Sequence, residues 1–373
     1  MKRETIAPLT FHVLCFTLYN CPMSNWNQII GHDWAVQLLA NALRHDRAGH
    51  AYLITGPAHI GKTTLARTFA QALNCTAVVD ERPCGECRNC KLIAADRHPD
   101  VRLVQPDISS RGKPTIKIEQ MRELQQGLSL AAYEGRYKVA ILTQFDAANA
   151  NAANAFLKTL EEPPNNVVLL LTANDADTLL PTIASRCRTI GLRPLPTDLI
   201  EQSLTTRWHV PEQQAHVLAC LADGRLGWAV QASQDETILQ TRAARLAQLQ
   251  DVLAGNRVTR FDVADKLSRK AEELPDVLQS WLSWWRDLLV LAQAQRTAPA
   301  QHTAPAQHTA PAPLALTNVD HETALRELAA AWSSPHILES LQQTNLALWQ
   351  LQRNANTRLV LENLFLTYPQ RAA

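Results

Sequence analysis

Residues 56–63 have the composition of a phosphate-binding loop, because the segment GPAHIGKT matches the pattern G-x-x-x-x-G-K-[ST] in full. In this pattern the glycines let backbone N–H groups turn toward a phosphate, the lysine reaches the β- and γ-phosphates, and the threonine hydroxyl ligates Mg²⁺. A buried strand is expected before the segment, at 51–54, and a helix after it, at 62–73, which is the context that gives the pattern meaning. We therefore predict a nucleotide-binding site made by Gly56, Gly61, Lys62, Thr63 and Thr64, with ATP and Mg²⁺ as its candidate ligands.

Hydrolysis of ATP would require acidic residues that the neighbouring strand does not supply. P-loop ATPases place carboxylates at the end of such a strand, where they hold Mg²⁺ and polarise the attacking water. The strand expected at 139–142 is followed by Thr143 and Gln144, which carry no charge. Asp146 comes two residues later, out of register for a metal ligand, and we interpret it as the N-cap of a helix that begins at Ala147. The sequence thus predicts a phosphate site without its hydrolytic acids.

Four of the eight cysteines lie close together in the pattern C-x₈-C-x₂-C-x₂-C. Four thiolates can converge on one tetrahedral Zn²⁺ and leave no open coordination position, so such a zinc site would be structural. Clustering of this kind in a long chain favours a metal site in a reducing compartment over a secreted disulfide scaffold. Free thiols and an iron–sulfur cluster are the alternatives. We predict a zinc module over 75–90 with the ligands Cys75, Cys84, Cys87 and Cys90.

Length and composition limit the class of protein further. A chain of 373 residues is too long for a single core, and 46% hydrophobic residues exclude wholesale disorder. The 36 Lys and Arg residues are balanced by 35 Asp and Glu residues, which argues against a polybasic protein that coats nucleic acid. No run of about 18 or more apolar residues is present, so we expect no membrane span and a cytoplasmic protein.

The chain changes character at Pro194. Before it, strands expected at 51–54, 101–104, 139–142 and 167–172 alternate with helices, which predicts an α/β parallel sheet. After it the strand signal disappears, and short helices over 197–230 precede longer ones over 236–294 and 321–368.

Two segments are expected to lie outside the folded domains. Residues 297–313 repeat the hexapeptide TAPAQH, which has no branched apolar side chain to bury and is expected to be a solvated linker or loop. The first 22 residues resemble a signal peptide only faintly, because polar residues interrupt their apolar stretch. We expect the extension 1–23 to be disordered or to reflect a mis-assigned start.

Further motifs point to one family. The cysteine pattern follows the P-loop helix, and then come EGRYKV at 134–139, NAFLKTLEEPP at 154–164 and SRC at 185–187. Together these motifs resemble a bacterial clamp loader subunit of the AAA+ family. The resemblance implies a RecA-like AAA+ P-loop domain at 24–194 that carries the zinc module, a small helical lid domain at 195–240, and an all-helical collar domain at 241–373 with the insert 297–313.

The resemblance also implies roles for single residues. Arg186 of the SRC motif would be an arginine finger that stabilises charge developing on the γ-phosphate of a nucleotide bound to an adjacent subunit. A surface arginine is the alternative. Asn174 lies near the family's sensor position, after the strand at 167–172. Gly227 and Trp228 occupy the place where ATPase members usually offer a nucleotide-sensing arginine.

Two subunit types of that family share these motifs. The motor subunit (gamma/tau) keeps an Asp-Glu pair after the strand at 139–142, and delta-prime subunits commonly lose it, so Thr143 and Gln144 favour the delta-prime type. The implied function is to help load the sliding clamp onto primed DNA within the DNA polymerase III holoenzyme, in a ring with gamma/tau and delta subunits, without autonomous catalysis. The alternatives are a motor-type clamp loader ATPase and a different AAA+ repair or recombination ATPase.

Two other groups of residues have competing interpretations. Trp281, Trp284 and Trp285 fall on one expected helix, where they could stack on bases, although a helical core or a subunit interface is favoured. Lys158 and the pair Glu161-Glu162 fit either a subunit interface or a solvated helix end.

Overall fold

The computed structural model of the chain describes residues 26–107, 114–297, 316–353 and 355–370. These residues fall into two units. The sheet unit comprises 26–55, 62–106 and 116–191, and the helical unit comprises the described part of 192–373 with the short segments 56–61 and 107–115. The predicted extension 1–23 and the hexapeptide insert from 298 onward lie outside the described residues. The division of 195–373 into a lid and a collar stays a prediction.

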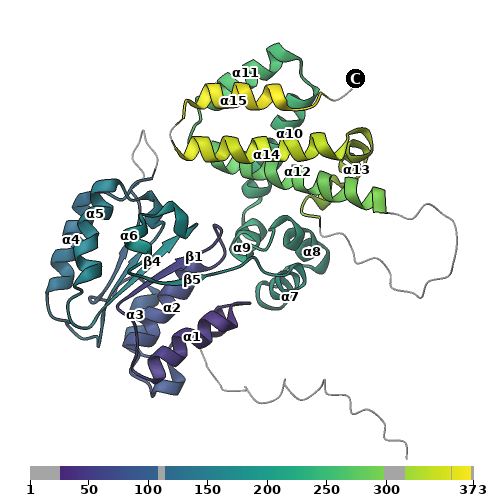
Figure 1. Cartoon of the computed structure of the whole chain (residues 1–373). Helices are drawn as coiled ribbons and strands as arrows, with labels where there is room; N and C mark the ends of the chain where they lie inside the picture. Colours follow the sequence, from purple (N-terminus) through teal and green to yellow (C-terminus); the bar gives the residue numbers. More distant parts are fainter. Residues whose placement is uncertain (1–25, 108–113, 298–315, 354, 371–373) are drawn as a thin grey trace, which may run out of the picture. The chain divides into compact units, whose positions relative to one another are not determined.

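The sheet unit is built on a parallel sheet of five strands with the order β2-β3-β4-β1-β5 (Figure 1). The strands are β1 (Ala51–Thr55), β2 (Val101–Val104), β3 (Lys138–Leu142), β4 (Val167–Ala173) and β5 (Arg188–Gly191). The neighbours β1 and β4 are buried along their whole length, which explains why each is a continuous apolar run. The predicted α/β fold with a RecA-like parallel sheet is confirmed.

Four of these strands were expected, and β5 was not. Three of its four residues are exposed, so the segment has no apolar run that sequence alone would identify. β5 forms because β1 offers a free edge, to which it pairs in parallel with Leu53 opposite Thr189.

Helices cover both faces of the sheet. Figure 1 shows α4 and α5 on one side and α1 to α3 on the other, and the core beneath α4 and α5 joins Met121 and Phe156 to Leu169. The helices are α1 (Asp33–Arg44), α2 (Lys62–Asn74), α3 (Arg88–Ala94), α4 (Ile118–Ser129), α5 (Ala150–Glu161) and α6 (Pro181–Ala184). Single 3-10 turns are η1 (Trp26–Gln28), η2 (Val79–Glu81), η3 (Phe145–Ala147) and η4 (Ala176–Thr178).

The described part of the helical unit contains no strand, in agreement with the sequence. Its helices are α7 (Thr197–Trp208), α8 (Glu212–Leu221), α9 (Leu226–Gln234), α10 (Glu236–Ala254), α11 (Arg257–Ser268), α12 (Leu274–Thr297), α13 (Glu322–Ala331), α14 (Ser334–Gln352) and α15 (Thr357–Thr367), with the 3-10 turn η5 (Val319–His321). The long helices α12 and α14 run side by side (Figure 1). Trp281, Trp284 and Trp285 of α12 are 0% exposed, so they form the core of this unit and offer no surface on which a base could stack.

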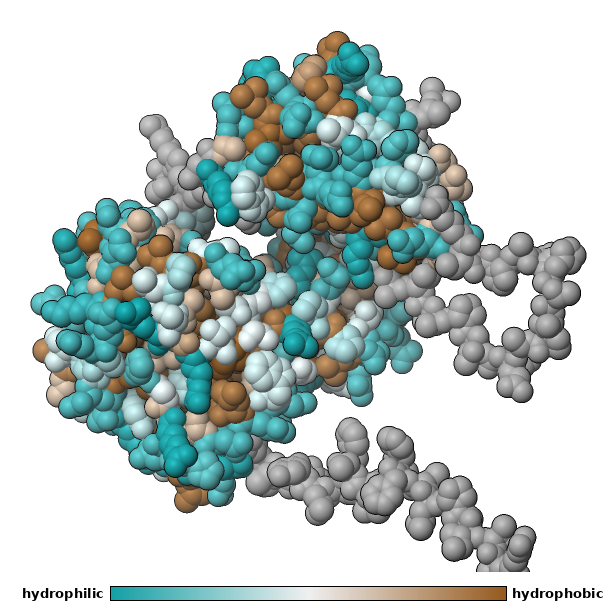
Figure 2. All heavy atoms as spheres, viewed as in Figure 1, coloured by the Kyte–Doolittle hydropathy of each residue, from teal (hydrophilic) through white to brown (hydrophobic). Residues whose placement is uncertain are grey.

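Hydrophilic side chains cover most of the face shown in Figure 2, with apolar side chains scattered between them. Large apolar side chains do reach the surface, among them Tyr133 of the sheet unit and Trp349 of the helical unit. Within the described residues, no helix is both long enough and apolar enough to cross a membrane.

Candidate nucleotide site and metal centre

The P-loop joins the buried strand β1 to the helix α2, as the sequence predicted. Gly56 and Gly61 have φ angles of 141° and 103°, a backbone conformation that residues with a Cβ rarely adopt. A Cβ at Gly56 would also lie 2.6 Å from the carbonyl oxygen of Leu192. Lys62 and Thr63 open α2, so the positive end of its dipole faces the place where the motif holds a phosphate.

The Lys62 side chain is buried and belongs to a chain of polar contacts within the sheet unit. Its Nζ donates to Oδ1 of Asn174 at 3.3 Å, and Nδ2 of Asn174 donates to Oδ2 of Asp146 at 3.2 Å. Burial lowers the pKa of Lys62 to about 8, and the nearby charge of Asp146 opposes that shift. Asn174, which the sequence places near the sensor position, therefore contacts the P-loop lysine directly.

The interpretation of Asp146 as a helix N-cap is wrong. α5 begins at Ala150, and its N-cap is Asn149, whose side-chain oxygen accepts from the Ala152 N–H at 2.8 Å. Between β3 and α5 the chain makes the 3-10 turn η3, which contains Asp146 and starts after Gln144 in the left-handed conformation with φ of 49°. The sequence prediction assumed an extended chain after β3 and so missed this turn. The turn changes which way the side chains point and places Asp146 beside Asn174.

Thr143 and Gln144 directly follow β3, where an ATPase would have its acidic pair. Thr143 is buried, and its hydroxyl donates to the carbonyl oxygen of Val104 at 3.3 Å. Gln144 donates its backbone N–H to the hydroxyl oxygen of Thr172 at 3.0 Å, and its side chain is exposed. Neither side chain supplies a negative charge for Mg²⁺ or a base for water.

The four clustered cysteines meet at one point of the sheet unit. Their sulfur atoms all lie within 4.8 Å of one another, and those of Cys75 and Cys87 are 4.0 Å apart. Tetrahedral zinc at about 2.3 Å from each sulfur requires sulfur atoms about 3.8 Å apart, so the donor set fits this ion. None of the four forms a disulfide. The cluster could therefore hold a metal ion, with zinc as the prediction.

Local structure builds this centre from two helix ends. Cys75 follows the last residue of α2, Cys87 is the N-cap of α3, and Cys90 lies in its first turn. The backbone N–H groups of Cys84, Cys87 and Cys90 donate to the sulfur atoms of Cys75, Cys84 and Cys87 at 3.4, 3.3 and 3.4 Å. Burial alone would raise the pKa of Cys87, but hydrogen bonds from Thr76 and Cys90 outweigh it and lower the pKa to about 6. These bonds favour the metal-binding thiolate form at Cys87, whereas burial raises the pKa of Cys75 and of Cys90.

Arg186 lies just beyond α6 on the sheet unit, and its guanidinium has two partners there. Its Nη2 forms an ion pair with Oε1 of Glu161 at 2.7 Å, and its Nη1 donates to the carbonyl oxygen of Thr182 at 2.8 Å. Glu161, for which the sequence left a solvated helix end or an interface open, is thus an ion-pair partner of Arg186. The side chain of Arg186 is 35% exposed, and the remaining N–H donors of the guanidinium are available to another group.

Gly227 lies in the first turn of α9 and contacts the P-loop segment within the helical unit. Its N–H donates to the carbonyl oxygen of His59 at 2.8 Å, and a Cβ at this position would lie 2.6 Å from the same oxygen. The arginine that ATPase members offer in this region would therefore not fit at Gly227. The neighbouring Trp228 instead lies under the guanidinium of Arg225, 5.9 Å from the ring centroid.

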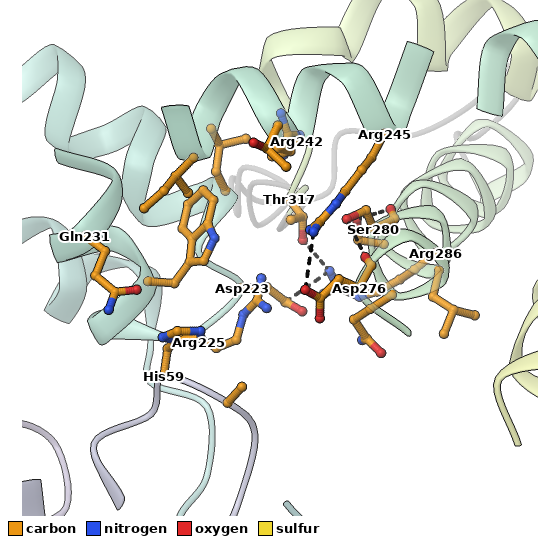
Figure 3. A pocket seen from close by; sticks show the side chains of 18 of the residues that line it. His59, Asp223, Arg225, Gln231, Arg242, Arg245, Asp276, Ser280, Arg286 and Thr317 are labelled. Atoms are coloured by element: carbon orange, nitrogen blue, oxygen red, sulfur yellow. Dashed lines mark hydrogen bonds and ion pairs between the residues drawn. The ribbon is translucent and has the colours of Figure 1, made fainter. Parts of the chain in front are cut away.

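A cavity of about 610 Å³ lies in the helical unit, and it is lined by Arg225, Arg242, Arg245 and Arg286 (Figure 3). Carboxylates accompany these arginines: Asp320 lies 2.6 Å from Arg242, Asp276 lies 3.2 Å from Arg245, and Asp223 and Asp287 lie 3.7 and 3.6 Å from Arg286. Of these carboxylates, Asp223 and Asp276 line the cavity, whereas Asp287 and Asp320 do not. We interpret the cavity as an internal ion-pair network, because three of its four arginines already have a carboxylate partner.

The sheet order and the P-loop after β1 define a RecA-like P-loop domain. Residues 31–196 match the family described as "DNA polymerase III, delta subunit". The chain is also similar to curated relatives of two kinds. It is 37% identical to the DNA polymerase III subunit delta' of Bacillus subtilis over 218 residues, which cover 58% of this chain and 64% of that protein.

Two further relatives are similar over shorter stretches. The subunit delta' of Pseudomonas aeruginosa is 42% identical over 156 residues, covering 42% of this chain and 47% of that protein. The subunit tau/gamma of Haemophilus influenzae is 40% identical over 176 residues, covering 47% of this chain and 25% of that protein. Over residues 31–196 the chain is thus similar to a delta-subunit family of DNA polymerase III, and its curated relatives are delta' and tau/gamma subunits. The chain spans 64% or less of the length of these three relatives.

Proposed function

We propose that this chain is a clamp loader subunit of the delta-prime type, which helps to load the sliding clamp onto primed DNA as part of the DNA polymerase III holoenzyme. The observation that carries the proposal is the uncharged pair Thr143 and Gln144 at the end of β3, where the motor subunit has an Asp-Glu pair. The lack of room for an arginine at Gly227 supports the same conclusion, because a working ATPase usually senses its nucleotide from that helix.

In this role the chain contributes binding and positioning. Gly56, Gly61, Lys62, Thr63 and Thr64 hold ATP and Mg²⁺ without hydrolysing the nucleotide, and the four cysteines hold a structural Zn²⁺. Arg186 acts as the finger in trans, placing its guanidinium against the γ-phosphate of ATP bound to a neighbouring motor subunit. The partners are gamma/tau and delta subunits in a ring, and the location is the cytoplasm.

A motor-type clamp loader ATPase is the second candidate. Two observations favour it: the P-loop pattern is intact, and the carboxylate of Asp146 contacts Asn174 next to Lys62. Similarity to relatives does not decide between the types, because identity reaches 42% with a delta' subunit and 40% with a tau/gamma subunit.

Nucleotide turnover separates the two candidates. The purified chain is assayed for ATP hydrolysis alone and after assembly with its motor subunits, and Lys62→Ala serves as the variant without a working P-loop. The delta-prime type predicts no hydrolysis by the isolated chain and the same background for Lys62→Ala. Hydrolysis by the isolated wild type that Lys62→Ala abolishes would establish the motor type instead.

A further inference from the structure

We infer that Asp146 is a ligand of the Mg²⁺ ion that accompanies a nucleotide in the P-loop. The inference rests on the proposed binding of nucleotide by this chain, and it is independent of the subunit type. It gives the site a carboxylate that the two residues directly after β3, Thr143 and Gln144, do not supply.

The first observation is an unused oxygen. Oδ2 of Asp146 accepts from Asn174, whereas Oδ1 is buried and has no hydrogen-bond partner. Buried carboxylate oxygens in native proteins nearly always have a donor or a cation, so an orphaned one indicates a missing ligand. Mg²⁺ binds oxygen ligands of this kind and is usually held by one or two carboxylates together with substrate phosphates.

The second observation is the identity of the neighbours. Asn174 joins Asp146 to Lys62, and the side chain of Lys62 is the one that the P-loop pattern directs toward the β- and γ-phosphates. Thr63, whose hydroxyl is the P-loop ligand for Mg²⁺, follows Lys62 directly in α2. Asp146 is therefore linked through the single side chain of Asn174 to the lysine of the phosphate site.

The third observation excludes the ordinary structural role. Asp146 does not cap α5, because Asn149 does so. A competing role remains, in which Asp146 is only an internal counter-charge for Lys62. The two roles predict opposite effects of removing the charge. Loss of a metal ligand weakens the binding of Mg²⁺-nucleotide, whereas loss of a counter-charge leaves the lysine free for phosphate and tightens the binding.

The test is the affinity of the full-length chain for a fluorescent ADP analogue, measured with excess Mg²⁺ and again with EDTA. We expect Mg²⁺ to tighten binding to the wild type at least tenfold. In Asp146→Asn this gain falls to less than twofold, while affinity in EDTA stays within about twofold of the wild type. Asp146→Glu, which keeps a carboxylate, restores at least part of the Mg²⁺ effect.

Two controls accompany the variant. Asp177→Asn removes the same charge from an exposed carboxylate in η4, three residues beyond Asn174, and is expected to keep the full Mg²⁺ effect. Thermal unfolding identifies any variant that fails to fold. The inference is overturned if Asp146→Asn keeps the Mg²⁺ effect, if it binds nucleotide more tightly in both buffers, or if the wild type binds no nucleotide. None of these results touches the finger role of Arg186, which is measured in the complex.

Discussion

At the scale of single residues, the ion pair between Glu161 and Arg186 explains how the proposed finger could be held in position. A finger acts by presenting its guanidinium at a fixed position, because stabilisation of the transition state depends on preorganised charge. Glu161 and the carbonyl oxygen of Thr182 hold two edges of the Arg186 guanidinium and leave its other donors unused. The ion pair thus joins the motif NAFLKTLEEPP at 154–164 to the motif SRC at 185–187.

The first prediction concerns Glu161→Gln. The pair is partly exposed, so its loss costs about 0.2–1 kcal/mol and should lower the ATPase rate of the assembled complex by about 1.4- to 5-fold. Steady-state ATPase of the reconstituted complex checks this, with exposed Glu162→Gln as the matched control. A higher rate in Glu161→Gln would mean that Glu161 restrains the finger and does not position it.

Gly227→Ala provides a second prediction at this scale. In an exposed helix, Gly→Ala usually stabilises by about 1 kcal/mol. Here the new Cβ would meet the His59 carbonyl oxygen at 2.6 Å, and backbone at that distance must shift. We expect a lower midpoint of thermal unfolding and weaker nucleotide binding than in the wild type. An unchanged or raised midpoint would show that α9 is not packed tightly against the P-loop segment at Gly227.

At the scale of elements, the four-cysteine centre replaces a hydrophobic core for the segment between α2 and α3. The turn η2 has no buried residue, so little apolar packing holds this excursion. We expect metal ligation to fix its conformation, since structural zinc stabilises small modules by several kcal/mol.

The third prediction follows for Cys84→Ser. We expect about one zinc ion per chain in the wild type, less than half of that in Cys84→Ser, and a lower unfolding midpoint for the variant. Chelation of the wild type should reproduce the shift. Cys220→Ser, outside the cluster, should keep its zinc. Elemental analysis decides the question, and iron with visible absorbance would point to an iron–sulfur cluster instead.

The loop before β3 depends on one carboxylate. Oδ1 of Asp100 accepts from the Tyr133 N–H at 2.7 Å, and Oδ2 accepts from the N–H groups of Glu134 and Gly135 at 2.8 Å each. Burial alone would raise the pKa of Asp100, but these hydrogen bonds hold it below its ordinary value. A depressed pKa means that the carboxylate stabilises the fold above the ordinary pKa of an aspartate and ceases to do so as the pH falls through the folded value.

Asp100→Asn tests this fourth prediction. The variant should lose about 2 kcal/mol of unfolding free energy at pH 7, where the wild type has a charged acceptor. The difference between the two proteins should shrink as the pH falls below about 4. Urea unfolding at both pH values measures it. A difference that stays constant with pH would mean that the charge of Asp100 does not matter.

Sequence alone predicted the elements that bury continuous apolar runs and the motifs with fixed spacing. It failed at β5, where pairing with β1 outweighs an exposed and polar segment. It also failed at Asp146, because the left-handed residue Gln144 redirects the chain, and no periodic pattern encodes such a turn. The ion pair of Glu161 with Arg186 was equally hidden, since only the fold brings α5 and α6 together.

At the scale of the whole molecule, the proposed function distributes the chemistry over a ring. This chain would supply a P-loop that holds nucleotide without turnover, a helical unit for assembly, and Arg186 for the active site of a neighbour. The central claim is that Arg186 acts in trans. Such a finger is worth about 10³–10⁵ in rate in the systems where it has been measured.

The most direct measurement is the DNA-stimulated ATPase of the complex assembled with Arg186→Ala, compared with Arg188→Ala, which removes an exposed arginine two residues away. Size-exclusion chromatography verifies that both complexes assemble. We predict that Arg188→Ala retains wild-type activity and that Arg186→Ala abolishes hydrolysis at the site it faces. Arg186→Lys should not restore this activity, because lysine lacks the planar guanidinium. An intact Arg186→Ala complex with the turnover of the Arg188→Ala complex would contradict the account.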